Sequence, residues 1–469
     1  MSRRAWLALP WLAVCACASA PVWEQPPPPV IDAPVVQPGA LHRAELENGL
    51  RILVLEDHRL PRVSFGLTLR HGEASLPAEQ AGLASLTAEL LKRGAGARDA
   101  LALASATDEL GASLGAGAGW DSIGVGVAGL SRDEDTLLAI LADVVLRPRF
   151  DPREAQRARS ERLAALERAK DDPATLMNWH AARALYSGHR YGVPSEGTPE
   201  SVAHFDARVA RDLHRRFFVP NDAVFAVVGD VETQDVLARV RRAFGAWGRG
   251  PVVGDGEPPP PQVPPARRVI VVDQPDLVQA RVLITHEGIA RSDPDRVAAG
   301  LLNSVVGGSG FSSRLMARVR SDAGLTYSVG SGFSLRRAPG PFVTSTFTRV
   351  PEVRRVIDLL LGELERARSE PPSEAELVSA RALAVGEFAL GLETSGAVMS
   401  SLVDLDVYGL PEDSLDSYRG RVRATTADQT AALAQRLFHP ERTLIVLVGP
   451  AAELTPQLEG LGPVEVIKP

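Results

Sequence analysis

The segment DARVARDLHRRFFVPNDAVFAVVGDV, residues 206–231, recurs near the C-terminus as TADQTAALAQRLFHPERTLIVLVGPA, beginning at Thr426. In each copy a helical pattern ends at a phenylalanine and a proline, and an apolar strand follows. The residues that recur at a constant offset are Leu213 and Leu433, Arg216 and Arg436, Phe218 and Phe438, Pro220 and Pro440, and Gly229 and Gly449. Self-similarity at one fixed offset indicates duplication, so the sequence predicts two homologous domains.

The order of strands and helices within each half predicts an α+β fold. The runs LRILVLED (50–57) and RVSFGLTLR (62–70) have strand patterns and precede long amphipathic helical runs. The second half repeats this order with RRVIVVD and ARVLITHE. We therefore predict, in each half, an antiparallel-rich sheet with helices packed on one face. The N-terminal domain is placed at residues 41–250 and the C-terminal domain at 267–469, joined by a proline-rich linker at 251–266.

The N-terminus has the pattern of a targeting segment. Residues 1–20 combine a basic start, an apolar stretch and small residues, which predicts a secretory signal, because the apolar stretch is too short for a membrane span of about 20 residues. Leu-Ala-Val-Cys-Ala-Cys resembles a bacterial lipobox. We expect lipidation at Cys17, with Cys15 or ordinary cleavage after residue 20 as alternatives, and thus an exported lipoprotein that faces the periplasm in the bacterial cell envelope. Residues 21–40 are proline-rich and predict an extended spacer.

Charge and cysteine content exclude some functional classes. The formal net charge is −7, which gives no indication of the basic face expected of a nucleic-acid-binding protein. Both cysteines lie in the targeting segment, so the body of the protein has no disulfide. We therefore expect no nucleic-acid partner and contact with a membrane through the lipid anchor only.

The segment AGLASLTAELLKRGA, residues 81–95, resembles the active-site helix of the pitrilysin/insulinase (inverzincin) peptidases, in which two histidines and a glutamate form the motif His-x-x-Glu-His. On that frame the first histidine falls on Ser85, the glutamate on Ala88 and the second histidine on Glu89. The resemblance also places the third ligand, a glutamate, at Ala165. Zinc needs imidazole, thiolate or carboxylate ligands, and hydrolysis needs a base that activates water. We expect no bound metal or cofactor and a chain that is inactive by itself, although the resemblance to a peptidase family leaves open whether it is an enzyme.

A second resemblance to this family lies in GGSGFSSRLMARVRSDAGLTYSV, residues 307–329. It implies that Arg320 and Tyr327, seven residues apart, reach toward the substrate, where a guanidinium and a phenol hydroxyl can hydrogen-bond a peptide carbonyl. The alternative is that Arg320 complements the C-terminus of its helix and Tyr327 packs in the core. Gly307 and Gly308 resemble the glycine-rich loop of the noncatalytic processing-peptidase subunit, which is linked to substrate handling; the alternative is a plain helix connection.

The resemblance to the short, two-domain branch of the family implies a function. We expect a noncatalytic subunit of a heterodimeric zinc metallopeptidase, forming one half of a clamshell. A partner chain with an intact His-x-x-Glu-His motif would hold the zinc, and this chain would supply Arg320, Tyr327 and chamber walls for unfolded peptide substrates. The alternative is a structural scaffold, similar to the core proteins of a respiratory complex, with no role in proteolysis. An active peptidase with an unconventional centre is a third hypothesis.

Overall fold

The computed structural model describes residues 33–37, 39–253 and 264–468. The expected targeting segment with Cys17, most of the proline-rich spacer and the middle of the expected linker lie outside these residues. Residues 34–469 form one compact unit. Within the described part of the chain, no helix combines the length and apolar character needed to cross a membrane.

The first half is built on a six-stranded sheet with the strand order β1-β2-β8-β3-β7-β6. Strands β2 and β8 pair in parallel, and the other neighbours are antiparallel. The strands are β1 (Leu41–Glu45), β2 (Arg51–Glu56), β3 (Arg62–Leu69), β6 (Ser113–Ala118), β7 (Ile123–Leu130) and β8 (Ala223–Gly229). The helices are α1 (Leu83–Leu91), α2 (Ala100–Asp108), α3 (Glu134–Leu146), α4 (Pro152–Ala169), α5 (Pro173–Leu185), α6 (Pro199–Ala203), α7 (Ala207–Phe217) and α8 (Thr233–Phe244).

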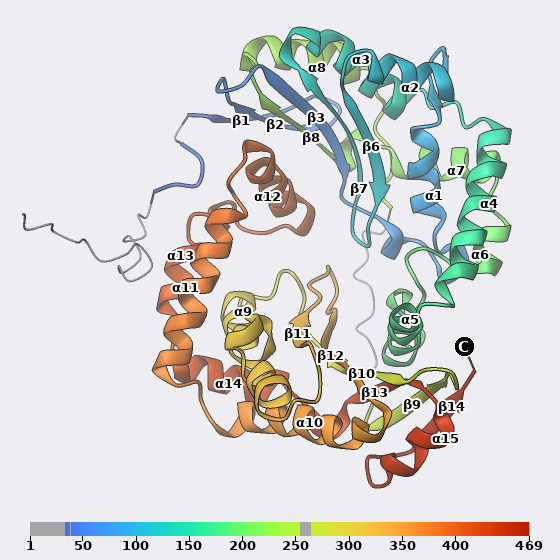
Figure 1. The fold of residues 1–469 in the computed structure, drawn as a ribbon. Coiled ribbons are helices and arrows are strands. Elements are labelled where there is room, and N and C mark those ends of the chain that lie inside the picture. The colour runs from blue at the N-terminus through green and yellow to red at the C-terminus, as the bar shows by residue number, and fades with distance from the viewer. Residues whose placement is uncertain (1–32, 38, 254–263, 469) are drawn as a thin grey trace, which may run out of the picture. The chain divides into compact units, whose positions relative to one another are not determined.

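The second half has a sheet of the order β11-β12-β10-β13-β9-β14, which repeats the first sheet except at one edge, where β14 pairs in parallel with β9. Its strands are β9 (Arg268–Asp273), β10 (Gln279–Glu287), β11 (Val329–Phe333), β12 (Pro341–Arg349), β13 (Leu444–Gly449) and β14 (Val464–Ile467). Its helices are α9 (Arg296–Asn303), α10 (Val353–Ser369), α11 (Glu374–Leu390), α12 (Ser395–Tyr408), α13 (Tyr418–Ala424), α14 (Ala427–Leu437) and α15 (Ala451–Leu454). The predicted α+β architecture with two homologous halves is confirmed (Figure 1).

The duplicated segment forms the same unit in both halves, a helix followed by a fully buried strand. Helix α7 leads into β8 and helix α14 leads into β13, and every residue of both strands is buried. Asp206 caps the start of α7, and Thr426 forms a capping box with Gln429 at the start of α14. Gly229 ends β8 with a φ of +134° and lies so close to the Arg62 carbonyl that any side chain would collide with it.

The two halves exchange one helix each. Helix α5 of the first half packs on strands β10 and β13, where Leu176 and Met177 join the buried cluster of the second sheet. Helix α12 of the second half packs on strand β8, where Met399 and Leu402 join the corresponding cluster of the first sheet. The prediction of helices on one face of each sheet was therefore incomplete, because the opposite face is covered by a helix from the other half. Sequence patterns record that a face is apolar, but not which segment covers it.

Candidate functional site

The degenerate motif lies on α1, which packs against α4 and so lies close to the position expected for the third ligand. Ser85 and Glu89 are one helical turn apart and partly exposed. Ala88 is only 1% exposed and belongs to the core of the first half. Ala165 lies on α4 with its surface exposed and lines a cavity. The structure therefore brings α1 and α4 together as the motif requires, but the side chains at the motif positions are not the histidines and glutamates of the motif.

An arginine that the sequence reading missed lies beside the first ligand position. Nη1 of Arg162, one turn before Ala165 on α4, donates a hydrogen bond to Ser85 Oγ at 3.0 Å and another to the Glu196 carbonyl at 2.9 Å. Ser85 Oγ in turn donates to the carbonyl of Gly82 at 3.0 Å. The position that corresponds to the first histidine therefore holds a serine hydroxyl, which accepts a hydrogen bond from the Arg162 guanidinium.

Glu89, the one remaining carboxylate of the motif, is held by two basic residues that directly follow its helix. Its carboxylate lies 2.9 Å from Lys92 Nζ and 3.2 Å from Arg93 Nη2. Arg93 also pairs with Glu161 of α4 at 2.7 Å. Burial raises the pKa of Glu89, but hydrogen bonds from Lys92 and Arg93 outweigh it, and the pKa lies below its ordinary value.

These residues do not fit a zinc ion. A serine, a buried alanine and an exposed alanine replace three of the motif residues, and the single carboxylate is neutralised by two cations. Within the described ranges, no group of three or more histidine, cysteine, aspartate or glutamate side chains is placed to hold a metal. A guanidinium beside Ser85 adds positive charge where a cation would have to bind.

A buried glutamate fixes the start of α1. Glu73 is completely buried, and its carboxylate accepts hydrogen bonds from the backbone N–H of Gly82 at 3.1 Å and of Ser85 at 2.8 Å. Arg190 Nη2 donates to the same carboxylate at 3.1 Å. Burial raises the pKa of Glu73 above its ordinary value, although these hydrogen bonds act to lower it. The carboxylate serves as a helix cap whose partners are distant in sequence, so sequence spacing gave no indication of it.

The side chains of Arg320 and Tyr327 lie against each other in the second half. The guanidinium carbon of Arg320 lies 4.4 Å from the centroid of the Tyr327 ring and 4.4 Å from that of Phe311. Both rings are exposed, Tyr327 at 71%, which argues against the core-packing alternative for this tyrosine. No ion pair involves Arg320 in the described chain, so the stacked guanidinium keeps its N–H donors for a ligand. Phe311 was not predicted, since nothing in its spacing marks it as the second ring.

Gly307 and Gly308 lie in a π-helical segment, Ser304–Gly308, that continues α9. A side chain on Gly307 would meet Ser331 of β11 and Leu315, and one on Gly308 would meet Asn303. These glycines allow the segment to pack closely against the strand that follows Tyr327. Close packing therefore accounts for both glycines. Gly310, with a φ of +61°, begins the turn that carries Phe311.

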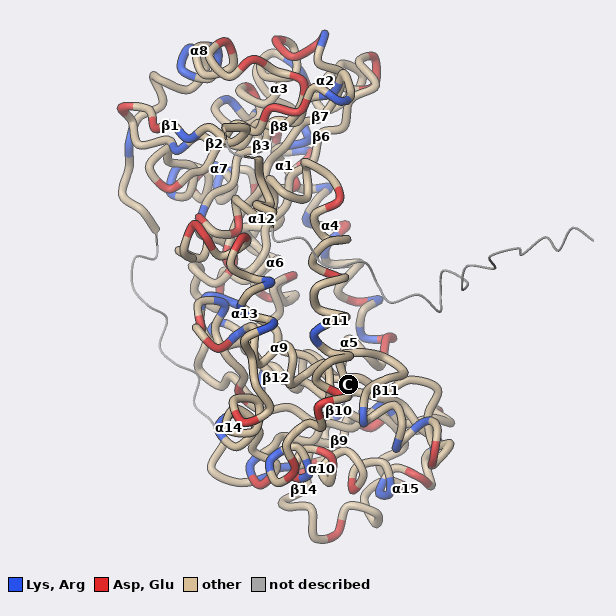
Figure 2. Tube along the Cα trace, turned by 90° about the vertical axis from the view of Figure 1, so that its left-hand side faces the viewer, with Lys and Arg blue, Asp and Glu red and all other residues tan. Residues whose placement is uncertain are grey.

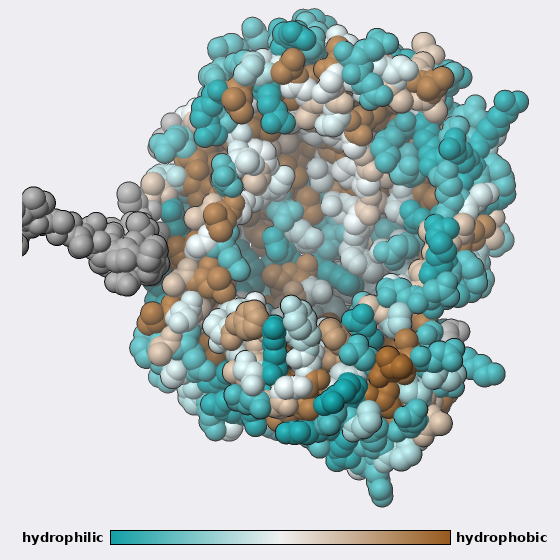
Figure 3. Space-filling model, in the orientation of Figure 1, coloured by the Kyte–Doolittle hydropathy of each residue, from teal (hydrophilic) through white to brown (hydrophobic). Residues whose placement is uncertain are grey.

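A cavity of about 590 Å³ lies beside the degenerate motif and is lined by residues of both halves. Its walls include Arg162, Ala165 and Trp179 of the first half and Arg336 of the second. The space-filling view shows a hollow between the elements of the two halves, in which polar and apolar residues are mixed (Figure 3). We call the cavity of about 590 Å³ that Arg162 and Arg336 line the arginine pocket.

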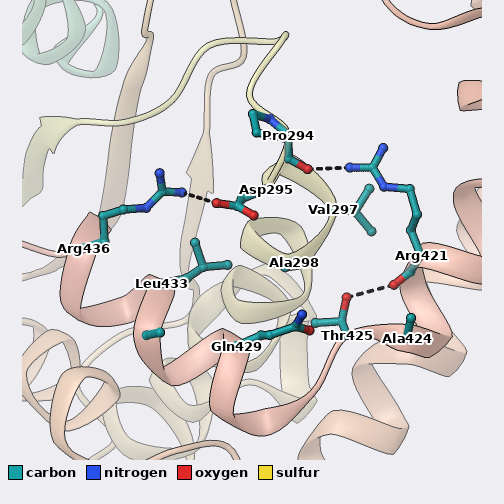
Figure 4. Close-up of a pocket in the computed structure, with 11 residues that line it drawn as sticks. Pro294, Asp295, Val297, Ala298, Arg421, Ala424, Thr425, Gln429, Leu433 and Arg436 are labelled. Carbon is teal, nitrogen blue, oxygen red and sulfur yellow. Dashed lines mark hydrogen bonds and ion pairs between the residues drawn. The ribbon is translucent and has the colours of Figure 1, made fainter.

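A second cavity, of about 440 Å³, lies among α9, α13 and α14. Its two arginines are already engaged, Arg436 with Asp295 at 2.7 Å and Arg421 with the carbonyl of Pro294 (Figure 4). Over the described trace, acidic and basic residues are interspersed without a continuous basic stripe (Figure 2). The arginine pocket is therefore the better candidate for ligand binding.

Comparisons with known proteins agree with this architecture. Residues 51–198 match the family model described as insulinase (peptidase family M16), and residues 204–383 match the peptidase M16 inactive domain. An uncharacterized zinc protease of Streptomyces coelicolor is 27% identical over 418 residues, which cover 88% of this chain and 90% of the relative. A peptidase M16 inactive domain from Pseudomonas fluorescens has a TM-score of 0.81 at 28% identity, covering 87% of this chain and 98% of that one.

A chain of complex III2 from Candida albicans shares the fold, with a TM-score of 0.73 at 16% identity, and covers 90% of this chain and 99% of that chain. The two family models together span most of the described residues. The chain belongs to the insulinase family of peptidases, peptidase family M16. The family resemblance drawn from the sequence is confirmed.

Proposed function

We propose that this chain is a noncatalytic subunit of a heterodimeric zinc peptidase of its family. It binds no catalytic zinc itself, and a partner chain with an intact His-x-x-Glu-His motif holds the metal. The observation that carries this proposal is the contrast between the two halves. The motif positions hold Ser85, Ala88, an ion-paired Glu89 and Ala165. In contrast, Arg320 lies against the exposed ring of Tyr327 and forms no ion pair among the described residues.

The chemistry of the exposed cluster suits a peptide. The guanidinium of Arg320 is held between two rings, so less conformational freedom is lost when its N–H groups bind a carbonyl. The hydroxyl of Tyr327 can donate a second hydrogen bond. Strand β6 lies at the edge of the first sheet, where an extended peptide can add as a further strand. In this proposal the chain binds and orients unfolded peptides, and the partner performs hydrolysis.

The experiment is co-expression with a family member that carries the intact motif. We expect the two chains to copurify and to cleave unstructured peptides. Arg320→Ala should lower turnover about 10²- to 10³-fold, the effect of removing one preorganised donor, and Tyr327→Phe should lower it without loss of the complex. Arg349→Ala is the matched control, because Arg349 is an exposed arginine at the end of β12. Unchanged turnover in both cluster variants would refute a shared site.

A scaffold role is the second candidate. Its support is the shared fold with the complex III2 chain, which at 16% identity concerns the fold alone. The two functions differ in one result: a scaffold subunit copurifies with partners, but its loss leaves peptide cleavage by the partner unchanged.

We further propose that the chain is exported and anchored to a membrane of the bacterial envelope by lipid on Cys17. Mass spectrometry of the mature N-terminus tests this. A lipid-modified Cys17 supports the anchor, and Cys17→Ala should then release the protein into the soluble fraction. A mature N-terminus at residue 21 would instead indicate ordinary cleavage.

A further inference from the structure

Arg336 lines the arginine pocket from the second half of the chain and has an unusual environment. Its guanidinium carbon lies 4.6 Å from the centroids of both the Trp120 and the Tyr191 rings. No ion pair within 4 Å and no side-chain hydrogen bond involves this guanidinium among the described residues. Burial lowers the pKa of Arg336, although an arginine remains charged at neutral pH. A partly desolvated cation without an anionic partner is costly, and an incoming anion would relieve that cost.

A second cation lines the same pocket. Arg162 uses Nη1 for both of its hydrogen bonds, to Ser85 Oγ and to the Glu196 carbonyl, which leaves the rest of its fork available. The one acidic residue in the lining is Glu196, an exposed residue whose charge acts on the neighbouring Arg190. Asp121, the carboxylate whose charge acts on Arg336, accepts hydrogen bonds from Tyr408 at 3.2 Å and from the Arg337 backbone N–H at 3.0 Å.

The walls of the pocket indicate what kind of anion it accepts. Trp120, Trp179 and Tyr191 supply apolar surface, and Asn178 and Thr175 supply hydrogen-bonding groups. The volume of about 590 Å³ is enough for a few amino-acid residues. Aromatic walls beside two guanidinium groups suit a carboxylate attached to apolar side chains, since arginine forks match carboxylate geometry and the rings bury the remainder.

We infer that the arginine pocket binds a carboxylate of a peptide, between Arg336 and Arg162 and beside Ala165 of the degenerate motif. The carboxylate belongs either to the C-terminus of the peptide or to an acidic side chain. This inference requires only the present chain, so it can fail or succeed independently of the proposed heterodimer.

The test is calorimetric titration of the full chain with three acetylated tetrapeptides of sequence Leu-Phe-Ala-Leu or Leu-Phe-Glu-Leu. The first has a free C-terminal acid, the second is its C-terminal amide, and the third is the amide with glutamate at the third position. Trp120 and Trp179 in the walls give an independent fluorescence signal. We expect the free acid or the glutamate peptide to bind about 10- to 100-fold more tightly than the neutral amide, the effect of charge-assisted hydrogen bonds. The form that binds identifies the source of the carboxylate.

Two variants and a control locate the binding. Arg336→Gln should remove most of the preference for the charged peptide. Arg162→Gln should reduce this preference while Arg336 stays stacked on its aromatic neighbours. Arg349→Gln, on an exposed arginine outside the pocket, should leave the affinity unchanged. Circular dichroism verifies that each variant is folded.

Three results would overturn the inference. Equal affinity for acid and amide would show that charge is not recognised, and an unchanged preference in both folded pocket variants would place binding elsewhere. Binding of inorganic phosphate without binding of any of the peptides would show a general anion site instead.

Discussion

Replacing Leu402 with alanine should destabilise a strand that is distant in sequence, because α12 covers the sheet of the other half. Leu402 is 5% exposed and packs in a buried cluster that contains Val224 and Val228 of β8. A nearly complete leucine side chain is therefore removed from a packed interface. The expected cost in the free energy of unfolding is about 2–5 kcal/mol.

Native-state hydrogen exchange measured by mass spectrometry gives the readout. A loss of 2 kcal/mol corresponds to about 30-fold faster exchange of the amides in β8 (Ala223–Gly229). Leu390→Ala in α11 is the matched control, because Leu390 is 74% exposed and its truncation should cost little. If the amides of β8 keep their protection while only those of α12 exchange faster, then α12 does not stabilise the sheet of the other half, and the reasoning is refuted.

Three further predictions concern pH, metal content and the cap of α1. Burial lowers the pKa of His286 to about 4 against 6.5 in a free histidine, so the stability that neutral His286 confers is present above pH 6.5 and is lost as the pH falls toward 4. His286→Gln should flatten the decline in unfolding free energy between pH 7 and pH 5 by about 2 kcal/mol in urea titrations, and an unchanged slope would contradict this. After equilibration with zinc and dialysis, the purified chain should retain far less than one zinc per molecule by elemental analysis; a stoichiometric ion would contradict the proposed division of labour. Glu73→Ala should cost about 3–5 kcal/mol in urea unfolding, since it leaves Arg190 buried without its partner, whereas Glu79→Ala, at an exposed position, should cost little, and equal losses would disprove the capping role.

Local patterns in the sequence were sufficient for much of the fold. The repeated helix and strand around Phe218 and Phe438 predicted the duplication, and the two sheets have equivalent central strands. The replacement of the motif residues at Ser85 and Ala88 was readable because the frame around them is local. Arg320 and Tyr327 were singled out by the resemblance of residues 307–329 to the family, and the short stretch of chain between them brings the two side chains together.

Two of the residues that sequence reasoning missed, Arg162 and Arg336, act across long separations. Arg162 meets Ser85 over 77 residues, and Arg336 reaches Trp120 from the opposite half of the chain. An arginine at an isolated position in the sequence has no pattern that distinguishes a solvated surface residue from one that lines a cavity. Phe311 is close to Arg320 in the sequence but was also missed, because only the turn that begins at Gly310 brings its ring to the guanidinium.

The sequence by itself determined the duplicated α+β architecture and the replacement of the motif residues at Ser85, Ala88 and Ala165, because both are read from residue types at fixed local spacing. Only the tertiary structure decided which helix covers the second face of each sheet, and which charges meet beside the degenerate motif. The physical reason is that apolar burial and the pairing of charges depend on proximity in space, and chain segments far apart in sequence become neighbours only when the two halves pack together.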